Sequence, residues 1–302
     1  MIERLVCRGL LATAFTATLA AQSPAFHAET RLVVIHATVT NSRGEMRTDL
    51  DQSAFTVLEN GRRQPIAVFR RDDIPVSLGV LLDNSGSMRP IRTCVEAAAL
   101  AFVRASNPDD EVFVVNFADD PKLIVPMTRD IGALETGIAH VDAIGGTGLR
   151  DAVHFAERYV RDHATWDRRA LLIVTDGKDN ASETTMKEIQ RDAEHGDTTV
   201  YGIGLFGRED RRDAEGRKEL DEITARTGGV AYYPSDVDQI DAAALTIARQ
   251  IRQQYTIGYT PTNAALDGTY RAIEVRAISR NRSERLRVRT RAGYRAEAAS
   301  SR

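Results

Sequence analysis

The pattern of hydrophobic and polar positions divides the chain into three segments. Between residues 30 and 74, short apolar runs are separated by polar turns, a pattern typical of β-strands. From 75 to 253, nearly continuous apolar runs alternate with amphipathic segments of helical period. The strand rhythm returns from 254 to 296. We therefore expect an α/β domain between two β-rich flanks.

The central stretch predicts a doubly wound, mainly parallel six-stranded sheet, which is a Rossmann-like α/β fold. Strands that helices cover on both faces have no polar side, and the apolar runs fit this requirement. The expected strands are 76–82, 111–117, 122–125, 170–175, 199–205 and 230–233. The expected helices are 90–104, 131–141, 149–163, 184–195, 220–226 and 237–253.

The two flanks predict a second, all-β domain. Three short strands cannot bury an apolar face alone, so we expect 30–74 and 254–296 to be the two halves of one β-sandwich-like domain. The domain 75–253 is then an insertion between these halves. Asn60-Gly61 is a hairpin signal, because both residues tolerate positive φ. The expected strands are 32–40, 54–58, 65–69, 255–259, 270–277 and 286–291.

The first residues predict a cleaved signal peptide over 1–21. Arg4 and Arg8 precede an apolar run from 9 to 21, and small residues around Ala20 or Ala25 suit signal peptidase. A membrane anchor is the alternative, but the run is shorter than the roughly 20 residues that span a bilayer. We expect a periplasmic or extracellular protein with no transmembrane segment after cleavage.

The net charge, the cysteines and one charged segment narrow the possible functions. A formal net charge of −3 gives no excess of Lys and Arg to neutralise phosphates, so we expect no nucleic-acid partner. Cys7 lies in the signal segment, which leaves Cys94 without a disulfide partner in the mature chain. Cys94 falls on an apolar helical face, which favours a buried inert thiol over a reactive one. The charged segment 207–218 is expected to be a solvated surface loop, with a ligand-contacting loop as the alternative.

A set of oxygen-bearing side chains is expected at one edge of the sheet. The sequence DNSGSM, from Asp83 to Met88, lies where the first strand of the α/β domain ends, and Asp83, Ser85 and Ser87 alternate within it. Thr147 in a glycine-rich loop and Asp176 after a buried strand reach the same edge. We expect both aspartates to face solvent there. Hard oxygen ligands of this kind suit Mg²⁺, with Mn²⁺ or Ca²⁺ as alternatives.

This spacing of D-x-S-x-S, threonine and aspartate resembles the metal-ion-dependent adhesion site of von Willebrand factor A domains. The resemblance implies that Ser85, Ser87 and, when a ligand is engaged, Thr147 touch the metal directly. Asp83 and Asp176 then act mostly through water. Both flanks resemble exported bacterial proteins related to this family, through Asp49-Leu50, 55–61, Gln254-Tyr255 and 291–294.

The expected function is binding rather than catalysis. Neutral hydroxyl ligands leave the metal much of its positive charge, so it would accept an Asp or Glu carboxylate of a protein partner in adhesion or complex assembly. Three alternatives stay open. DNSGSM could simply cap a helix; the chain could be a structural module without a ligand; or it could be a metal-dependent or serine hydrolase. The serine hydrolase lacks a G-x-S-x-G motif and would need a distant base such as His154.

Overall fold

The central sheet of the computed structural model has six strands in the order β10-β9-β8-β5-β6-β7. The structure describes residues 32–139, 145–206, 211–236, 239–279 and 284–297, and the predicted signal peptide 1–21 lies outside them. Neighbouring strands are parallel except for β7, which runs antiparallel to β6. The strands are β5 (Ser77–Asp83), β6 (Glu111–Phe117), β7 (Pro121–Thr128), β8 (Arg169–Thr175), β9 (Thr199–Gly204) and β10 (Ala231–Tyr232).

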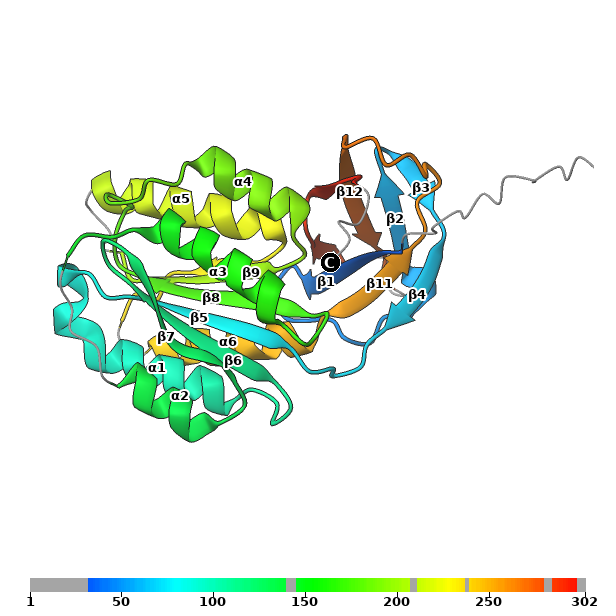
Figure 1. The fold of residues 1–302 in the computed structure, drawn as a ribbon. Coiled ribbons are helices and arrows are strands. Elements are labelled where there is room, and N and C mark those ends of the chain that lie inside the picture. The colour runs from blue at the N-terminus through cyan, green and yellow to red at the C-terminus, as the bar shows by residue number, and fades with distance from the viewer. Residues whose placement is uncertain (1–31, 140–144, 207–210, 237–238, 280–283, 298–302) are drawn as a thin grey trace, which may run out of the picture. The chain divides into compact units, whose positions relative to one another are not determined.

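Helices cover both faces of this sheet (Figure 1). Side chains of α1, α2 and α6 share one hydrophobic core with the sheet, and those of α3, α4 and α5 share the other. The two faces divide along β5, where Leu78 and Val80 enter the first core and Leu81 enters the second. The helices are α1 (Arg92–Arg104), α2 (Ile131–Ile138), α3 (Leu149–His163), α4 (Met186–His195), α5 (Arg211–Thr227) and α6 (Gln239–Arg252), with a 3-10 turn η2 (Gly86–Ile91) before α1.

The flanks form two further sheets, each of four antiparallel strands and each drawn from both ends of the chain. Their orders are β13-β1-β11-β4 and β14-β12-β2-β3. Apolar side chains of the two sheets share one core, including Ile35, Val57, Ile257 and Val275. The elements are β1 (Val33–Asn41), η1 (Gln52–Ala54), β2 (Phe55–Glu59), β3 (Arg62–Gln64), β4 (Ile66–Arg70), β11 (Tyr255–Tyr259), β12 (Tyr270–Ala277), β13 (Leu286–Arg289) and β14 (Gly293–Arg295).

The predicted fold class is confirmed: a doubly wound α/β domain and an all-β part from both flanks. The domain boundaries at 74 and 253 stay predictions. Asn60 and Gly61 have φ values of 47° and 77° and form the tight turn between β2 and β3. Cys94 is half-buried against the first core and makes no disulfide.

Two parts of the predicted fold were wrong. Residues 211–218, expected in a surface loop, form the first turns of α5, which starts at Arg211 rather than near 220. This stretch is rich in Arg, Glu and Lys, which favour helix, so its charge did not distinguish a loop from a helix. Residues 207–210 lie outside the described part. Strands β3 and β14 were missed, because three residues are too few to show an alternation.

Glu157 is a buried carboxylic acid on α3. Burial raises its pKa to about 8, against the effect of a hydrogen bond from Thr198. The negative charges of Asp192 and Asp197 raise the pKa of Glu157, and Arg161 lowers it. The folded protein therefore holds this carboxyl group in its neutral form at neutral pH.

The free energy of unfolding should consequently fall as pH rises from about 4.5 to about 8. The unfolded chain releases this proton near the ordinary pKa of 4.5, whereas the folded chain keeps it until about pH 8. Glu157→Gln stays neutral throughout, so its stability relative to the wild type should rise with pH by on the order of a few kcal/mol. Urea unfolding of both proteins across this range measures the difference. Parallel curves would contradict the assignment.

Candidate metal centre

Asp83 organises the turn that follows β5. Its Oδ1 accepts a hydrogen bond from the Ser85 backbone N–H at 2.9 Å, and its Oδ2 accepts one from the Thr175 hydroxyl at 2.6 Å. Asp83 is only 4% exposed, so the expectation that it faces solvent was wrong. The turn that follows β5 covers the end of the strand and buries Asp83, because η2 starts only three residues later. Sequence reasoning missed Thr175, the residue before Asp176.

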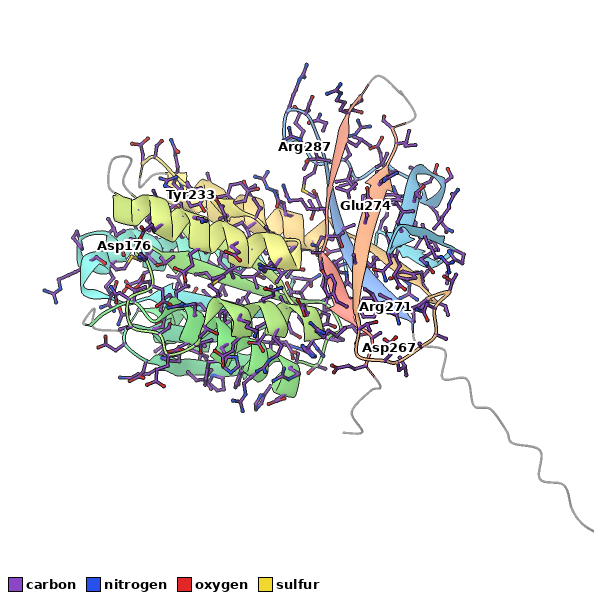
Figure 2. The ribbon with its side chains drawn as sticks, turned by 90° about the horizontal axis from the view of Figure 1, so that it is seen from above. Asp176, Tyr233, Asp267, Arg271, Glu274 and Arg287 are labelled. Carbon is purple, nitrogen blue, oxygen red and sulfur yellow. The ribbon has the colours of Figure 1, made fainter. Side chains whose placement is uncertain are left out.

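The two serine hydroxyls connect β5 to β8. Ser85 Oγ lies 3.0 Å from Ser87 Oγ, and the Ser87 hydroxyl donates to Asp176 Oδ1 at 2.8 Å. Asp176 follows the last residue of β8, at the carboxyl end of the sheet (Figure 2). Ser85 makes no side-chain cap to η2. Helix capping therefore does not account for the serines.

Thr147 lies beside this chain of hydrogen bonds, beneath Gly177. A Cβ atom at Gly177 would be 3.0 Å from the Thr147 hydroxyl oxygen, so a side chain there would press against this hydroxyl. Thr147 is 3% exposed and is held by its backbone: its N–H donates to Asn180 Oδ1 at 2.9 Å. The fold thus brings all five predicted residues to one edge of the sheet. That they bind a metal stays a prediction.

Asp119 and Asn180 shape the glycine-rich loop and were not predicted. Asp119 Oδ1 accepts from the Gly146 N–H at 2.7 Å, and Gly145 has a φ of 107°, which glycine adopts readily. Asp119 comes two residues after β6 and Asn180 five residues after β8. Their position after parallel strands is the signal that could have found them.

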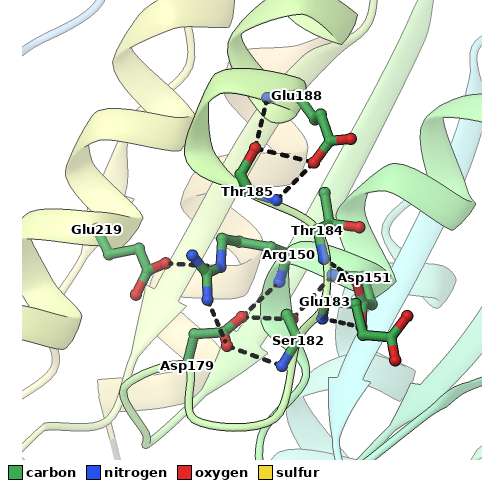
Figure 3. Close-up of polar contacts among 9 residues, drawn as sticks. All are labelled: Arg150, Asp151, Asp179, Ser182, Glu183, Thr184, Thr185, Glu188 and Glu219. Atoms are coloured by element: carbon green, nitrogen blue, oxygen red, sulfur yellow. Dashed lines mark hydrogen bonds and ion pairs between the residues drawn. The ribbon is translucent and has the colours of Figure 1, made fainter.

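A network of polar contacts fixes the loop between β8 and α4 (Figure 3). Asp179 bonds to Arg150 on α3 at 3.0 Å and to the Ser182 hydroxyl at 2.6 Å. Asp151, the next residue on α3, accepts the backbone N–H groups of Glu183 and Thr184 at 3.0 and 2.8 Å. The loop beside Asp176 is therefore tied to α3 at two successive residues.

Negative charge accumulates at this edge. Burial raises the pKa of Asp83 to about 6, hydrogen bonds from Thr175 and Ser85 lower it, and the nearby charge of Asp176 raises it. Burial also raises the pKa of Asp176, and the charge of Asp213 on α5 adds to this rise. The carboxylates of Asp83 and Asp176 repel each other across the serine hydroxyls, and a divalent cation, which takes hard oxygen ligands, would offset this repulsion.

Two alternatives are a metal site made only of His, Cys, Asp or Glu and a serine hydrolase with His154 as its base. Within the described residues, no group of three or more His, Cys, Asp or Glu is arranged to hold a metal. His154 Nδ1 lies 2.6 Å from Asp192 Oδ2, while the hydroxyls of Ser85 and Ser87 bond to each other and to Asp176. Among the described residues, neither of these serine hydroxyls makes a hydrogen bond to His154.

Residues 78–178 match the family model of the von Willebrand factor type A domain, and this range includes all five candidate residues. The chain therefore contains a von Willebrand factor type A domain. No curated protein matches it. Across the described part of the chain, no helix has the length and apolar character needed to cross a membrane.

Three solved structures share the fold, each with a TM-score of 0.50. A von Willebrand factor type A protein from Catenulispora acidiphila is 16% identical, with 75% of this chain and 52% of that chain covered. Proximal thread matrix protein 1 from mussel byssus, with a zinc-occupied site of the adhesion type, is 16% identical (60% and 48% covered). A mutant of the PilB minor pilin from Streptococcus sanguinis is 12% identical (61% and 63%). The match spans less than two thirds of each protein.

Proposed function

We propose that this protein is an exported, periplasmic or extracellular module for adhesion or complex assembly, and not an enzyme. It binds Mg²⁺, with Mn²⁺ or Ca²⁺ as substitutes, and through the metal it binds an Asp or Glu of a protein partner. The observation that carries the proposal is the group of acids and hydroxyls at the end of β5 and β8. The proposed metal-binding residues are Asp83, Ser85, Ser87, Thr147 and Asp176.

The exposure of these groups suggests how a partner would approach. Ser87 is exposed and Asp176 is partly exposed, whereas Asp83 and Ser85 are buried. A metal held by neutral hydroxyls keeps positive charge and attracts an anionic ligand from solvent. The Ser87 side of the centre is the open side, so a partner's carboxylate would reach the metal there. Ser85 and Ser87 would orient the ion, and Asp83 would hold the turn that carries them.

Isothermal titration calorimetry with Mg²⁺, followed by affinity capture from the native cell envelope with and without EDTA, tests this function. We expect magnesium binding, and capture of a protein that EDTA releases. Absence of magnesium binding, or capture that EDTA does not affect, would overturn the proposal.

Thr147→Ala should weaken partner binding more than magnesium binding. The hydrogen-bonded chain of Ser85, Ser87 and Asp176 forms without the Thr147 hydroxyl, so we expect the glycine-rich loop to shift when a partner brings this oxygen to the metal. We expect magnesium affinity to fall by less than about threefold and partner affinity by roughly tenfold or more. Thr147→Ser, which keeps the hydroxyl, is the matched control. Equal losses of both affinities would remove the argument for a moving threonine.

A further inference from the structure

A groove lies next to the candidate metal centre, on the side of α3. Helix α3 forms one wall, and the turn at 119–121 and the loop at 181–184 complete it. We call it the α3 groove. Its volume is about 820 Å³, which is within the range of sites that accept several side chains or a small ligand.

The groove and the metal centre share structural residues. Asp119 lines the groove and accepts the N–H of Gly146, the neighbour of Thr147. On the other side, Ala181 lines the groove and donates its N–H to the Thr147 carbonyl at 3.3 Å. A partner whose carboxylate reached the metal would therefore have the near end of the groove beside it.

An aromatic face runs along the α3 wall. Phe155 stacks on Tyr159 with ring centroids 6.3 Å apart, and Tyr159 stacks on His163 at 4.2 Å. The Tyr159 hydroxyl is fixed by the backbone N–H of Met127 at 3.0 Å. Such a wall offers a preformed apolar surface for the aliphatic part of a long side chain.

The charge of the groove is negative. Its cationic side chain is Arg158, beside His154 and His163. Asp120, in the turn at 119–121, and Glu183, in the loop at 181–184, are exposed residues of its lining. Five carboxylates line it: Asp119, Asp120, Asp151, Asp162 and Glu183. An occupant that is complementary in charge must be basic, and one that is complementary to the aromatic wall must have an aliphatic stem, which together describe arginine or lysine.

We infer that the α3 groove binds a basic, extended segment of the same protein partner, with an arginine or lysine near the acid that reaches the metal. This inference rests on the proposed function, because the metal centre would anchor the partner and the groove would select it. Pairs between exposed charges contribute little affinity each, so the groove would set specificity and rate of association rather than supply most of the binding.

Short synthetic peptides on the full-length protein test the inference. Each peptide carries one aspartate in a Gly-Ser background, with two arginines at increasing distances from it. Matched peptides replace the arginines by glutamines, and a second set replaces the aspartate by asparagine. Fluorescence anisotropy measures the affinities in Mg²⁺ and in EDTA. We expect the best arginine peptide to bind roughly 10-fold more tightly than its glutamine match in Mg²⁺.

The double variant Asp120→Asn/Glu183→Gln should remove most of this preference for arginine, while the affinity for the glutamine peptide stays unchanged. Asp72→Asn/Asp167→Asn changes the net charge equally at two exposed positions outside the groove and should keep the preference. Raising the salt from about 0.05 M to about 0.5 M should also reduce the preference, because exposed charges are screened.

The outcomes separate the two proposals. Equal affinity for arginine and glutamine peptides, both lost in EDTA, would overturn the groove and support the metal centre. Arginine-dependent binding that needs neither Mg²⁺ nor the peptide's aspartate would support the groove and contradict the proposed function. A preference for arginine that the groove variant keeps would also overturn the assignment to these residues.

Discussion

Asp83→Asn is expected to lower the affinity for Mg²⁺ by about 100-fold or more, although asparagine has nearly the same size. The substitution removes the negative charge, and it disturbs the acceptor that orients both Ser85 and Thr175. Saturating Mg²⁺ should stabilise the wild type by about 2.7 kcal/mol at 100 times its Kd, and this gain should vanish in the variant. Calorimetry and thermal melting in Mg²⁺ and in EDTA measure both effects.

Asp167→Asn is the matched control for this experiment, because Asp167 is exposed and lies outside the candidate site. It should bind Mg²⁺ and respond to EDTA like the wild type. Loss of binding in Asp83→Asn would be uninformative if the variant were unfolded, so its circular dichroism and its melting in EDTA should match those of the wild type. Magnesium binding at wild-type affinity in a folded Asp83→Asn protein would show that Asp83 is not part of the site.

Glu59→Ala should destabilise the β-rich part by about 2 to 5 kcal/mol. Glu59, at the end of β2, is 3% exposed, and its Oε2 accepts hydrogen bonds from Tyr259 at 2.7 Å and Tyr294 at 2.9 Å. The Glu59 side chain thus links strand β2 of the N-terminal flank to β11 and β14 of the C-terminal flank. Burial, together with the hydrogen bond to Glu59, raises the pKa of Tyr294 to about 12, so its hydroxyl stays a donor.

Glu59→Gln keeps an acceptor oxygen at this position and should recover part of the lost stability. Urea unfolding of the three proteins gives the comparison, and Tyr259→Phe in each background measures the coupling between the two side chains. A loss below about 1 kcal/mol in Glu59→Ala would mean that water or another donor compensates for the missing carboxylate.

The periodicity of hydrophobic positions was sufficient to predict the bounds of elements whose burial is uniform. The strand at 111–117 and the helix at 149–163 were predicted with the bounds that the structure has, since one is buried throughout and the other has a single apolar face. Helix α5 was predicted too short, because its first turns are mostly charged and do not show the apolar periodicity on which the prediction relied. The order in which the flank strands pair could not be predicted from the sequence. The need to bury apolar faces predicted that the two flanks associate, but no pattern indicated that β1 lies between β11 and β13.

Some residues of the candidate site could be predicted from the sequence and others could not. The five proposed residues follow a spacing that can be read along the chain, because the carboxyl ends of parallel strands meet at one edge. Asp119 and Asn180 also follow parallel strands, but no motif singles them out among the other polar residues of their loops, and each acts through a contact to the glycine-rich loop. Asp213 lies on α5 and affects Asp176 only through its charge. Tertiary packing, which local patterns do not encode, decides which polar residue in a loop points inward.

The position of β1 also constrains the order in which the molecule can fold. Both neighbours of β1 belong to the C-terminal flank, and the contact between His36 and Thr256 spans 220 residues. During synthesis β1 therefore emerges long before any partner strand, while the α/β domain between them has its contacts nearer in sequence. Closing this loop is slow, and an unpaired strand edge invites association with other chains until it closes. Synthesis of the C-terminal flank from β11 onward, rather than formation of the first strands, should set the time at which both sheets of the β-rich part appear.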